Sequence, residues 1–233
     1  GEGTETGAIE GPGFDSPEEA VSAYLEALKN GDAEGMLSTF AIETYVAEMD
    51  AQAYLERMWA FTPGDFRGAP VSDPYMRQIA VYQRQADLAD ELYSQYLFYS
   101  WPEEYGEFSA DALKLNGEAE VEAFLSALSA STFTSTLGSL EIVEFVEPAE
   151  LSDLYLNERN QQTIAGQAAS YGCDELVNVA AKLDVGGEEW YQCMDVARYG
   201  EKWYNLSLSG NIGILLGMSS YAAGLAPASE LML

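Results

Sequence analysis

The stretch that decides the fold spans residues 175–208 and reads ELVNVAAKLDVGGEEWYQCMDVARYGEKWYNLSL. Aliphatic, β-branched and aromatic residues dominate it, and two glycine-containing pairs, Gly186-Gly187 and Tyr199-Gly200, interrupt it. Such pairs form the tight turns whose twist matches the strands that they join. The pattern therefore predicts a three-stranded antiparallel meander, with strands at about 175–185, 188–198 and 201–209.

The two turns also predict which side chains share a face, because side chains alternate along a strand. With the turns as hairpin centres, Ala180 lies opposite Cys193 and Val196 lies opposite Trp203. One face then carries no ionisable side chain, so we expect the helices to cover it. Its predicted members are Val177, Val179, Ala181 and Leu183, then Trp190, Gln192, Met194 and Val196, then Trp203, Asn205 and Ser207.

The residues on this face favour binding over catalysis. A general acid or base must be a titratable group in the site, and the predicted face offers only amides and a hydroxyl. Such groups orient a ligand by hydrogen bonds, so we predict no catalytic residue. Asp195 falls on the opposite face, where we expect a solvated or hydrogen-bonded strand residue. The candidate ligand-binding residues are Trp190, Gln192, Trp203 and Asn205.

The charge of the chain excludes several classes of function. Its 233 residues include 39 Asp and Glu, 10 Lys and Arg and no His, which gives a net charge of −29. Without His there is no Ser-His-Asp triad and no His metal ligand. Without a basic cluster, binding to nucleic acid or to an anionic membrane is unfavourable. We expect no metal site and no cofactor, while weak calcium binding and a halophilic origin stay open.

The opening of the chain predicts a tether. Residues 1–13, GEGTETGAIEGPG, are rich in Gly, and the chain begins with Gly1 rather than Met. We expect a flexible segment left after processing of an exported protein, which would lie outside the cell, tethered to the envelope as a lipoprotein. Residues 14–233 then form a single domain.

The two cysteines are expected to stay unbridged. In the predicted register Cys193 faces Ala180, seven residues along the chain from Cys173. That offset corresponds to roughly 23 Å, far beyond the Cα separation of a disulfide. The uncharged run at 205–229 is long enough to cross a bilayer, but its Gly and Ser favour a terminal strand followed by a buried tail.

Helices are predicted on either side of these strands. Ser16-Pro17-Glu18-Glu19 fits a capping box with Pro in the first turn. Ser72-Asp73-Pro74 begins the longest helix, which carries a heptad seam that we expect to pack within the domain. The seam consists of Tyr75, Ile79, Tyr82, Ala86, Ala89, Tyr93 and Tyr96. Further predictions are helices at about 32–40, 43–61, 118–130 and 153–171, and a strand at about 140–146.

This order of elements resembles the nuclear-transport-factor superfamily, a cystatin-like α+β cone. The opening Ser16-Pro17-Glu18-Glu19-Ala20-Val21, with Tyr24-Leu25 and Lys29-Asn30-Gly31-Asp32, resembles its first helix and turn. The segment Tyr199-Gly200-Glu201-Lys202-Trp203-Tyr204 resembles its last hairpin. The resemblance covers about 15–62 and 139–210. It implies an α+β fold with N-terminal helices packed on a curved antiparallel sheet, and a helical insertion at about 63–137.

The superfamily contains ketosteroid isomerase-like enzymes and non-catalytic lipoprotein domains of exported Gram-positive proteins. Its enzymes use an Asp or His base inside the cone, which this sequence does not place there. We therefore expect a non-catalytic cell-surface domain that binds a small molecule, protein or glycan between its helices and the Trp190 and Trp203 face. Nucleic acid and a transmembrane span are not expected, and the oligomeric state stays open. Two alternatives remain: an isomerase or hydrolyase in which Glu43 or Asp50 reaches inward, and a structural envelope module.

Overall fold

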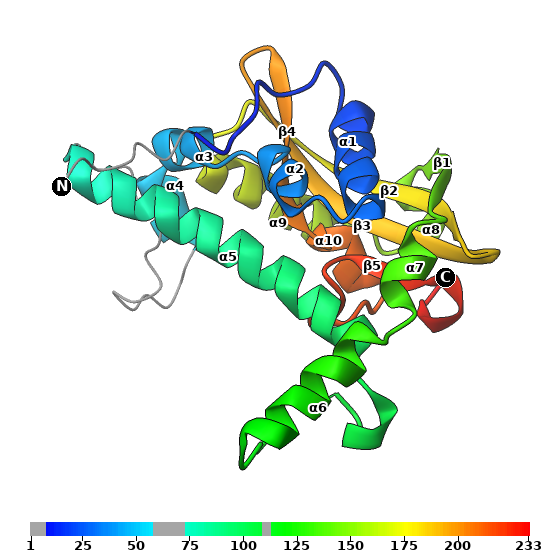
Figure 1. Cartoon of the computed structure of the whole chain (residues 1–233). Helices are drawn as coiled ribbons and strands as arrows, with labels where there is room; N and C mark the ends of the chain where they lie inside the picture. The colour runs from blue at the N-terminus through cyan, green and yellow to red at the C-terminus, as the bar shows by residue number, and fades with distance from the viewer. Residues whose placement is uncertain (1–7, 58–72, 109–112) are drawn as a thin grey trace.

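The computed structural model describes residues 8–57, 73–108 and 113–233, and it shows an α+β fold. A five-stranded antiparallel sheet forms its centre, with strand order β1-β2-β3-β4 (Figure 1). The short β5 pairs with the part of β3 that β4 does not reach. The strands are β1 (Glu141–Val146), β2 (Glu175–Val185), β3 (Glu188–Tyr199), β4 (Lys202–Leu208) and β5 (Leu225–Pro227).

Helices cover both faces of this sheet, and α6 extends away from the body of the molecule (Figure 1). The α-helices are α1 (Pro17–Lys29), α2 (Ala33–Ser38), α3 (Glu43–Glu48), α4 (Ala51–Arg57), α5 (Pro74–Ser100), α6 (Glu118–Ser129), α7 (Phe133–Leu137), α8 (Pro148–Leu151), α9 (Glu158–Tyr171) and α10 (Gly210–Leu215). Three 3-10 turns complete the described elements: η2 (Glu103–Tyr105), η3 (Ser220–Ala222) and η4 (Ala228–Glu230).

The predicted first helix and its packing are confirmed. The Ser16 hydroxyl accepts a hydrogen bond from the Glu19 N–H at 3.1 Å and caps α1. The apolar stripe of α1 lies on the sheet, where Tyr24 meets Phe40 edge to face with ring centroids 5.9 Å apart. Both rings are fully buried, so the face without ionisable side chains is covered as expected.

The first hairpin follows the predicted register. Gly186 and Gly187 have φ of +65° and +85°, as a type I′ turn requires, and Ala180 lies opposite Cys193. The second hairpin differs from the prediction by two residues. Its turn is centred on Gly200-Glu201 rather than Tyr199-Gly200, so Val196 lies opposite Asn205 instead of Trp203.

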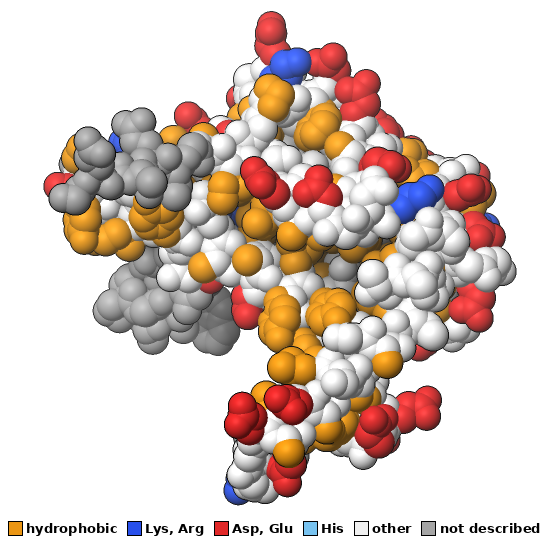
Figure 2. Space-filling view, in the orientation of Figure 1, with side chains coloured by type: hydrophobic (Ala, Val, Ile, Leu, Met, Phe, Trp, Pro, Cys, Tyr) orange, Lys and Arg blue, Asp and Glu red, His pale blue; other side chains and the backbone are white. Residues whose placement is uncertain are grey.

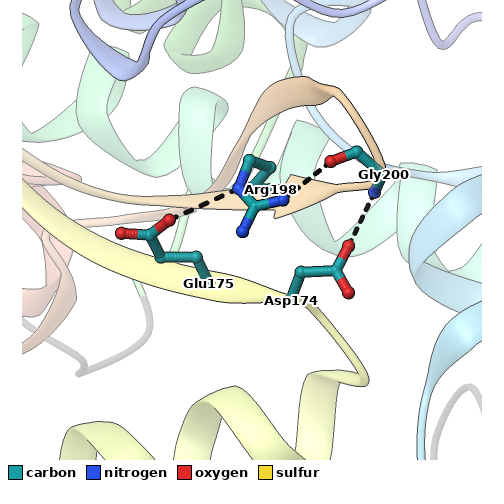
Figure 3. A network of polar contacts seen from close by, with 4 residues as sticks. All are labelled: Asp174, Glu175, Arg198 and Gly200. Carbon is teal, nitrogen blue, oxygen red and sulfur yellow. Dashed lines mark hydrogen bonds and ion pairs between the residues drawn. The ribbon is translucent and has the colours of Figure 1, made fainter.

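A polar network explains why this turn moves along the chain (Figure 3). The Arg198 guanidinium pairs with Glu175 at 3.3 Å and donates a hydrogen bond to the Gly200 carbonyl at 2.8 Å. The Gly200 N–H donates to the Asp174 carboxylate at 2.7 Å. These contacts hold Gly200, with φ of +64°, in the first turn position, where positive φ favours glycine.

A β-bulge then changes the faces at the end of β4. The β3–β4 pairing shifts by one residue between Asp195 and Val196, so Leu208 lies opposite Met194 and joins the core. Ser207 lies opposite Asp195, on the second face of the sheet. The prediction that Ser207 shares the face of Gln192 is therefore wrong, because an extra residue in one strand reverses every side chain beyond it.

The second face is also covered, which the sequence analysis did not predict. Ala180 and Cys193 pack against Ile212 and Leu216 of the C-terminal segment. Asp195 is consequently only 1% exposed, so it is hydrogen-bonded but not solvated. The expected strand followed by a buried tail is confirmed, and no helix within the described ranges is long and apolar enough to cross a membrane.

Two helix predictions need correction. The helix expected over 43–61 breaks at Met49, whose backbone is extended, and the Asp50 carboxylate caps α4 by accepting from the Ala53 N–H. Residues 58–61 lie outside the described residues. The heptad seam of α5 points outward except at its last residue, Tyr96, because another stripe with heptad spacing, Val81, Leu88 and Gln95, is buried instead. The seam residues among the exposed large side chains are Tyr75, Ile79, Tyr82 and Tyr93.

The predicted tether is docked over its described part. Ile9 packs against the core, and the Gly11 N–H donates to the Ser38 carbonyl at 2.9 Å. The Glu10 carboxylate accepts from the backbone N–H of Thr44 at 3.0 Å and also from that of Ile42. The prediction of a flexible tether is therefore wrong for residues 8–13. Residues 1–7 lie outside the described residues.

Replacing Trp203 by alanine tests how deeply this edge of the sheet belongs to the core. Trp203 is half-buried, and its backbone forms an antiparallel bridge with that of Phe14. We expect a loss of about 1–3 kcal/mol of unfolding free energy, less than the ~3–5 kcal/mol of a full core site. Phe40→Ala, at a fully buried ring, is the matched comparison. Urea unfolding that gives equal losses for both variants would contradict this placement.

Candidate functional site

The predicted amides, Gln192 and Asn205, are buried and hydrogen-bonded within the protein. Both are 0% exposed. The Gln192 Nε2 donates to the carbonyls of Cys193 and Ala223, each at 3.1 Å. The Asn205 Nδ2 donates to the Ala20 carbonyl at 2.8 Å and to the Thr39 hydroxyl at 2.9 Å. These bonds fasten the C-terminal segment and the first helices to the sheet.

The predicted tryptophans lie at the margin of the same core. Trp203 has its ring 5.8 Å from the Arg198 guanidinium. Trp190 contacts Tyr99, with ring centroids 5.4 Å apart. The structure does not gather the four predicted residues around either cavity described below, so their role in ligand binding stays a prediction.

A cavity of about 330 Å³ lies between the helices instead, and no strand residue is among its described lining. We call it the helix cavity. The end of α1, α2, α5 and α7 form its walls, and mainly apolar side chains line it: Leu28, Met36, Leu92, Tyr96, Phe133 and Leu137. Its size falls at the lower end of the range of about 300–1,000 Å³ for small-molecule sites.

Polar groups sit at defined points of this lining. Gln95 is 2% exposed, and its Nε2 donates to the Ala222 carbonyl at 3.0 Å. Lys29, in the last turn of α1, supplies the one positive charge of the described lining, and Thr134 adds a hydroxyl. An apolar interior with a few polar groups suits an amphipathic small molecule.

One aromatic chain connects the helix cavity to a predicted residue. Phe133 lines the cavity and stacks on Tyr99 with centroids 4.8 Å apart, and Tyr99 contacts Trp190. The Tyr99 hydroxyl donates to the Leu225 carbonyl, which fixes the ring between α5 and β5. Trp190 thus contacts the cavity wall through Tyr99 but does not line the cavity.

The dense aromatic residues near the end of α5 have a structural role. Phe108 contacts Phe98 and Trp101, with centroids 5.6 and 5.2 Å apart, and Trp101 contacts Phe124 of α6 at 5.4 Å. The rings therefore form a small core of their own, which holds α6 against the end of α5.

A second cavity, of about 380 Å³, opens on the other face of the sheet. We call it the Asp195 cavity. The Asp195 carboxylate accepts hydrogen bonds from the Asn178 amide and from the Ser207 hydroxyl, the latter at 3.0 Å. The Tyr155 hydroxyl donates to the side-chain amide oxygen of Asn178, Oδ1, at 3.0 Å. The network thus joins the segment before α9 to β2, β3 and β4.

The chain closes tightly over Asp195. A side chain at Gly210 would place its Cβ 2.1 Å from the Asp195 Oδ1, so only glycine fits there. Ser209 has φ of +67°, which is rare for a residue with a side chain. Burial raises the pKa of Asp195, although the bonds from Asn178, Ser207 and the Asn211 backbone lower it in part.

Glu91, on the exposed side of α5, brings a second carboxylate to this cavity. Although Glu91 keeps an exposed surface, the cavity walls desolvate its carboxyl group in part, which raises its pKa. The charge of Arg84 lowers this pKa, and the charges of Asp87 and Asp90 raise it. Of the two inward-reaching acids suggested by the sequence, Asp50 caps α4 and Glu43 is half-buried, and neither lines either cavity.

The cysteines are free, as predicted. Burial raises the pKa of Cys173 to about 11 and raises that of Cys193 as well, so both thiols stay protonated at neutral pH. The described residues include no group of three or more His, Cys, Asp or Glu side chains that could hold a metal ion. On the face that Figure 2 shows, the acidic side chains are spread over several elements.

No protein-family model and no curated protein matches the chain. A solved structure that is similar is the crystal structure of a cystatin-like protein from Ruminococcus gnavus ATCC 29149 at 2.10 Å resolution. The TM-score is 0.49 and the identity 16%, over 90% of this chain and 44% of that one. This chain thus spans less than half the length of that structure. The helices and the antiparallel sheet of this chain themselves establish its α+β class.

Proposed function

We propose that this chain is a non-catalytic binding domain of an exported cell-surface protein, and that it takes a small, largely apolar molecule into the helix cavity. The observation that carries the proposal is the cavity itself, about 330 Å³ with mainly apolar side chains around it. Apolar surface left open to water has an energetic cost that a bound ligand removes.

The polar groups suggest how a ligand would be oriented. Lys29 and Asn30 follow each other at the end of α1, while Gln95 lies on α5 across the cavity. A ligand with an anionic or hydrogen-bond-accepting group near Lys29 and an apolar body toward Leu92 and Phe133 would fit this arrangement. The chain has a net charge of −29, so a positive charge at Lys29 contrasts with the acidic character of the rest of the protein.

Binding is favoured over the isomerase alternative by the state of the buried carboxylate. The Asp195 cavity does hold a carboxylate, which is what such an enzyme would need. However, Asn178, Ser207 and the Asn211 backbone already donate to Asp195, so few lone pairs are left to take a proton from a substrate. The helix cavity offers no carboxylate among its described lining residues.

The surface location belongs to the same proposal. The Gly-rich composition of residues 1–7, GEGTETG, supports export, since such composition is common in tethers between an anchor and a folded domain. Fractionation of the cells that make the protein tests this part: export predicts the chain in the envelope or outside the cell.

Binding of anilinonaphthalene sulfonate, an anionic apolar dye, tests the ligand site. We expect saturable fluorescence with one dye per chain, and a loss of affinity of about tenfold or more in Leu92→Trp, which fills the cavity. Leu97→Trp, at a half-buried leucine of the same helix outside the lining, is the matched control and should bind as the wild type does.

Lys29→Gln should weaken dye binding about three- to fivefold if the sulfonate lies beside the ammonium group. Circular dichroism confirms that each variant is folded. Dye binding that is absent in the wild type, or equal in Leu92→Trp and the wild type, would refute the proposed site.

A further inference from the structure

The heptad seam of α5 lies on the surface along nearly its whole length. Its large side chains up to Tyr93 are between 43% and 73% exposed, and the two alanines between them are exposed as well. On the face that Figure 2 shows, hydrophobic side chains follow the course of α5. We call the exposed residues the outer seam: Tyr75, Ile79, Tyr82, Ala86, Ala89 and Tyr93. A continuous apolar row of this kind marks an interaction surface.

The spacing of the outer seam indicates another helix as its partner. Its residues recur at intervals of four and three, which is the a and d pattern of a coiled coil. From Tyr75 to Tyr93 the row runs about 27 Å along α5, at the helical rise of 1.5 Å per residue. An extended strand presents its side chains with a period of two and could not match this row.

The outer seam is complementary to itself when two copies of α5 run antiparallel. Pairing them about the level of residue 84 sets Tyr82 opposite Ala86 of the second copy and Ile79 opposite Ala89 of the second copy. Tyr75 then meets Tyr93. Each alanine leaves room for the large side chain that faces it, so the layers interdigitate. A parallel pair would instead set alanine against alanine and leave gaps.

The borders of the outer seam carry little of the negative charge of the chain. The positions that flank the a and d residues hold Met76, Gln78, Gln83, Gln85, Asp90 and Leu92. Asp90 is the one ionisable residue among them, and the antiparallel pairing sets it beside Met76 of the second copy. No two acidic residues of these borders therefore face each other, although two chains of net charge −29 repel at long range.

The area of the outer seam suits a small, reversible interface. An aromatic or aliphatic side chain exposed to this extent offers on the order of 100 Å². The large side chains of both copies, together with Met76, which is 49% exposed, therefore bury about 1,000 Å² in total. That area reaches the lower limit for a specific contact and predicts a dissociation constant in the micromolar range.

We propose that the outer seam is a dimer interface, in which α5 of one chain packs antiparallel against α5 of a second copy. The dimer is closed and two-fold symmetric, because both chains use the same surface. Burial of the tyrosine rings and Ile79 stabilises it, without ion pairs across the interface. The interface goes beyond the ligand binding proposed for the helix cavity, so either can fail without the other.

Sedimentation velocity over a range of concentrations tests the dimer. We expect a monomer–dimer equilibrium at about 10–200 µM in 150 mM salt. Association should be at least about threefold tighter in 500 mM salt, because the salt screens repulsion between two acidic chains and leaves the apolar contact in place. A chain that stays monomeric up to about 200 µM in both salts, or a dimer that salt dissociates, would overturn the proposal.

Two alanine-to-glutamate variants separate the seam from the overall charge. Ala86→Glu places a carboxylate against Tyr82 of the second copy and should weaken dimerisation about tenfold or more. Ala123→Glu adds the same charge at an exposed alanine of α6 and should change the dissociation constant less than about twofold. Glutamate favours helix at both exposed positions, so both variants should fold. Equal effects of the two variants would contradict a contact through the outer seam.

Single cysteines test the antiparallel direction. A mixture of Ile79→Cys and Ala89→Cys should form a mixed disulfide on oxidation, because these positions face each other across the interface. Neither variant alone should cross-link, since the two copies of one position lie about 15 Å apart along the helices. The wild type, with Cys173 half-buried and Cys193 buried, is the blank. Cross-linking of Ile79→Cys with itself would indicate a parallel pair and would overturn the arrangement.

Discussion

Replacing Gly172 by alanine is expected to lower the unfolding free energy by more than about 3 kcal/mol, or to prevent folding. Gly172 ends α9 with φ of +63°, and its N–H donates to the Ala169 carbonyl. A Cβ at this position would lie 1.7 Å from the Glu48 carbonyl oxygen, which no side-chain rotation relieves. The end of α9 or the break between α3 and α4 would have to move.

Gly31→Ala is the matched control. Gly31 also follows the end of a helix, α1, with nearly the same φ of +66°, but a Cβ there would meet nothing within 4 Å. Its cost is therefore the left-handed backbone alone, about 1–2 kcal/mol. Urea unfolding of both variants measures the difference. If the two losses agree within about 0.5 kcal/mol, the close approach between α9 and Glu48 is not present in the protein.

The meander could be predicted because its information is local. Gly186-Gly187 can form the required turn without any tertiary contact, and the first hairpin has the predicted register. The second turn also depends on Asp174, which is distant in sequence and accepts a hydrogen bond from the Gly200 N–H only after the strands have paired. Local pattern therefore determined one turn and tertiary contacts the other.

The sites were less predictable, for two physical reasons. The bulge beside Asp195 reverses the side chains at the end of β4 and brings Ser207 to the carboxylate, and no residue pattern marks it. The second reason is that the same sequence offers two heptad-spaced stripes on α5. Burial of Val81 and Leu88 turns α5 so that Leu92 and Gln95, together with Tyr96 at the end of the seam, line the helix cavity.

One available signal could have indicated the Asp195 cavity. The segment Ser209-Gly210-Asn211 joins a strand to an uncharged, Gly-rich tail, and such small residues allow the chain to pass close to another group. In the structure that group is the Asp195 carboxylate. Without the strand register the sequence could not identify which side chain would be approached.

Replacing Asp195 by alanine is expected to cost about 3–5 kcal/mol of unfolding free energy. The carboxylate is 1% exposed and accepts from Asn178 and Ser207, so its removal leaves buried donors without an acceptor. Asp195→Asn keeps the shape and one acceptor oxygen, so its loss should be smaller. The two variants separate the loss of the network from the loss of the charge.

The difference in stability between the wild type and Asp195→Asn, followed as a function of pH, gives the sharper result. Burial raises the pKa of Asp195 in the folded protein, so the folded state holds this proton more tightly than the unfolded state does. The protonated Asp195 therefore contributes to the unfolding free energy. This contribution is fully present below the unfolded-state pKa of about 4 and is lost as the pH rises through the raised folded-state pKa. Asn does not titrate, so the unfolding free energy of the wild type minus that of Asp195→Asn should fall with rising pH across this window. Urea unfolding of both proteins at a series of pH values measures that difference. A constant difference, or one that grows with pH, would show that desolvation does not dominate the ionisation of this carboxyl group.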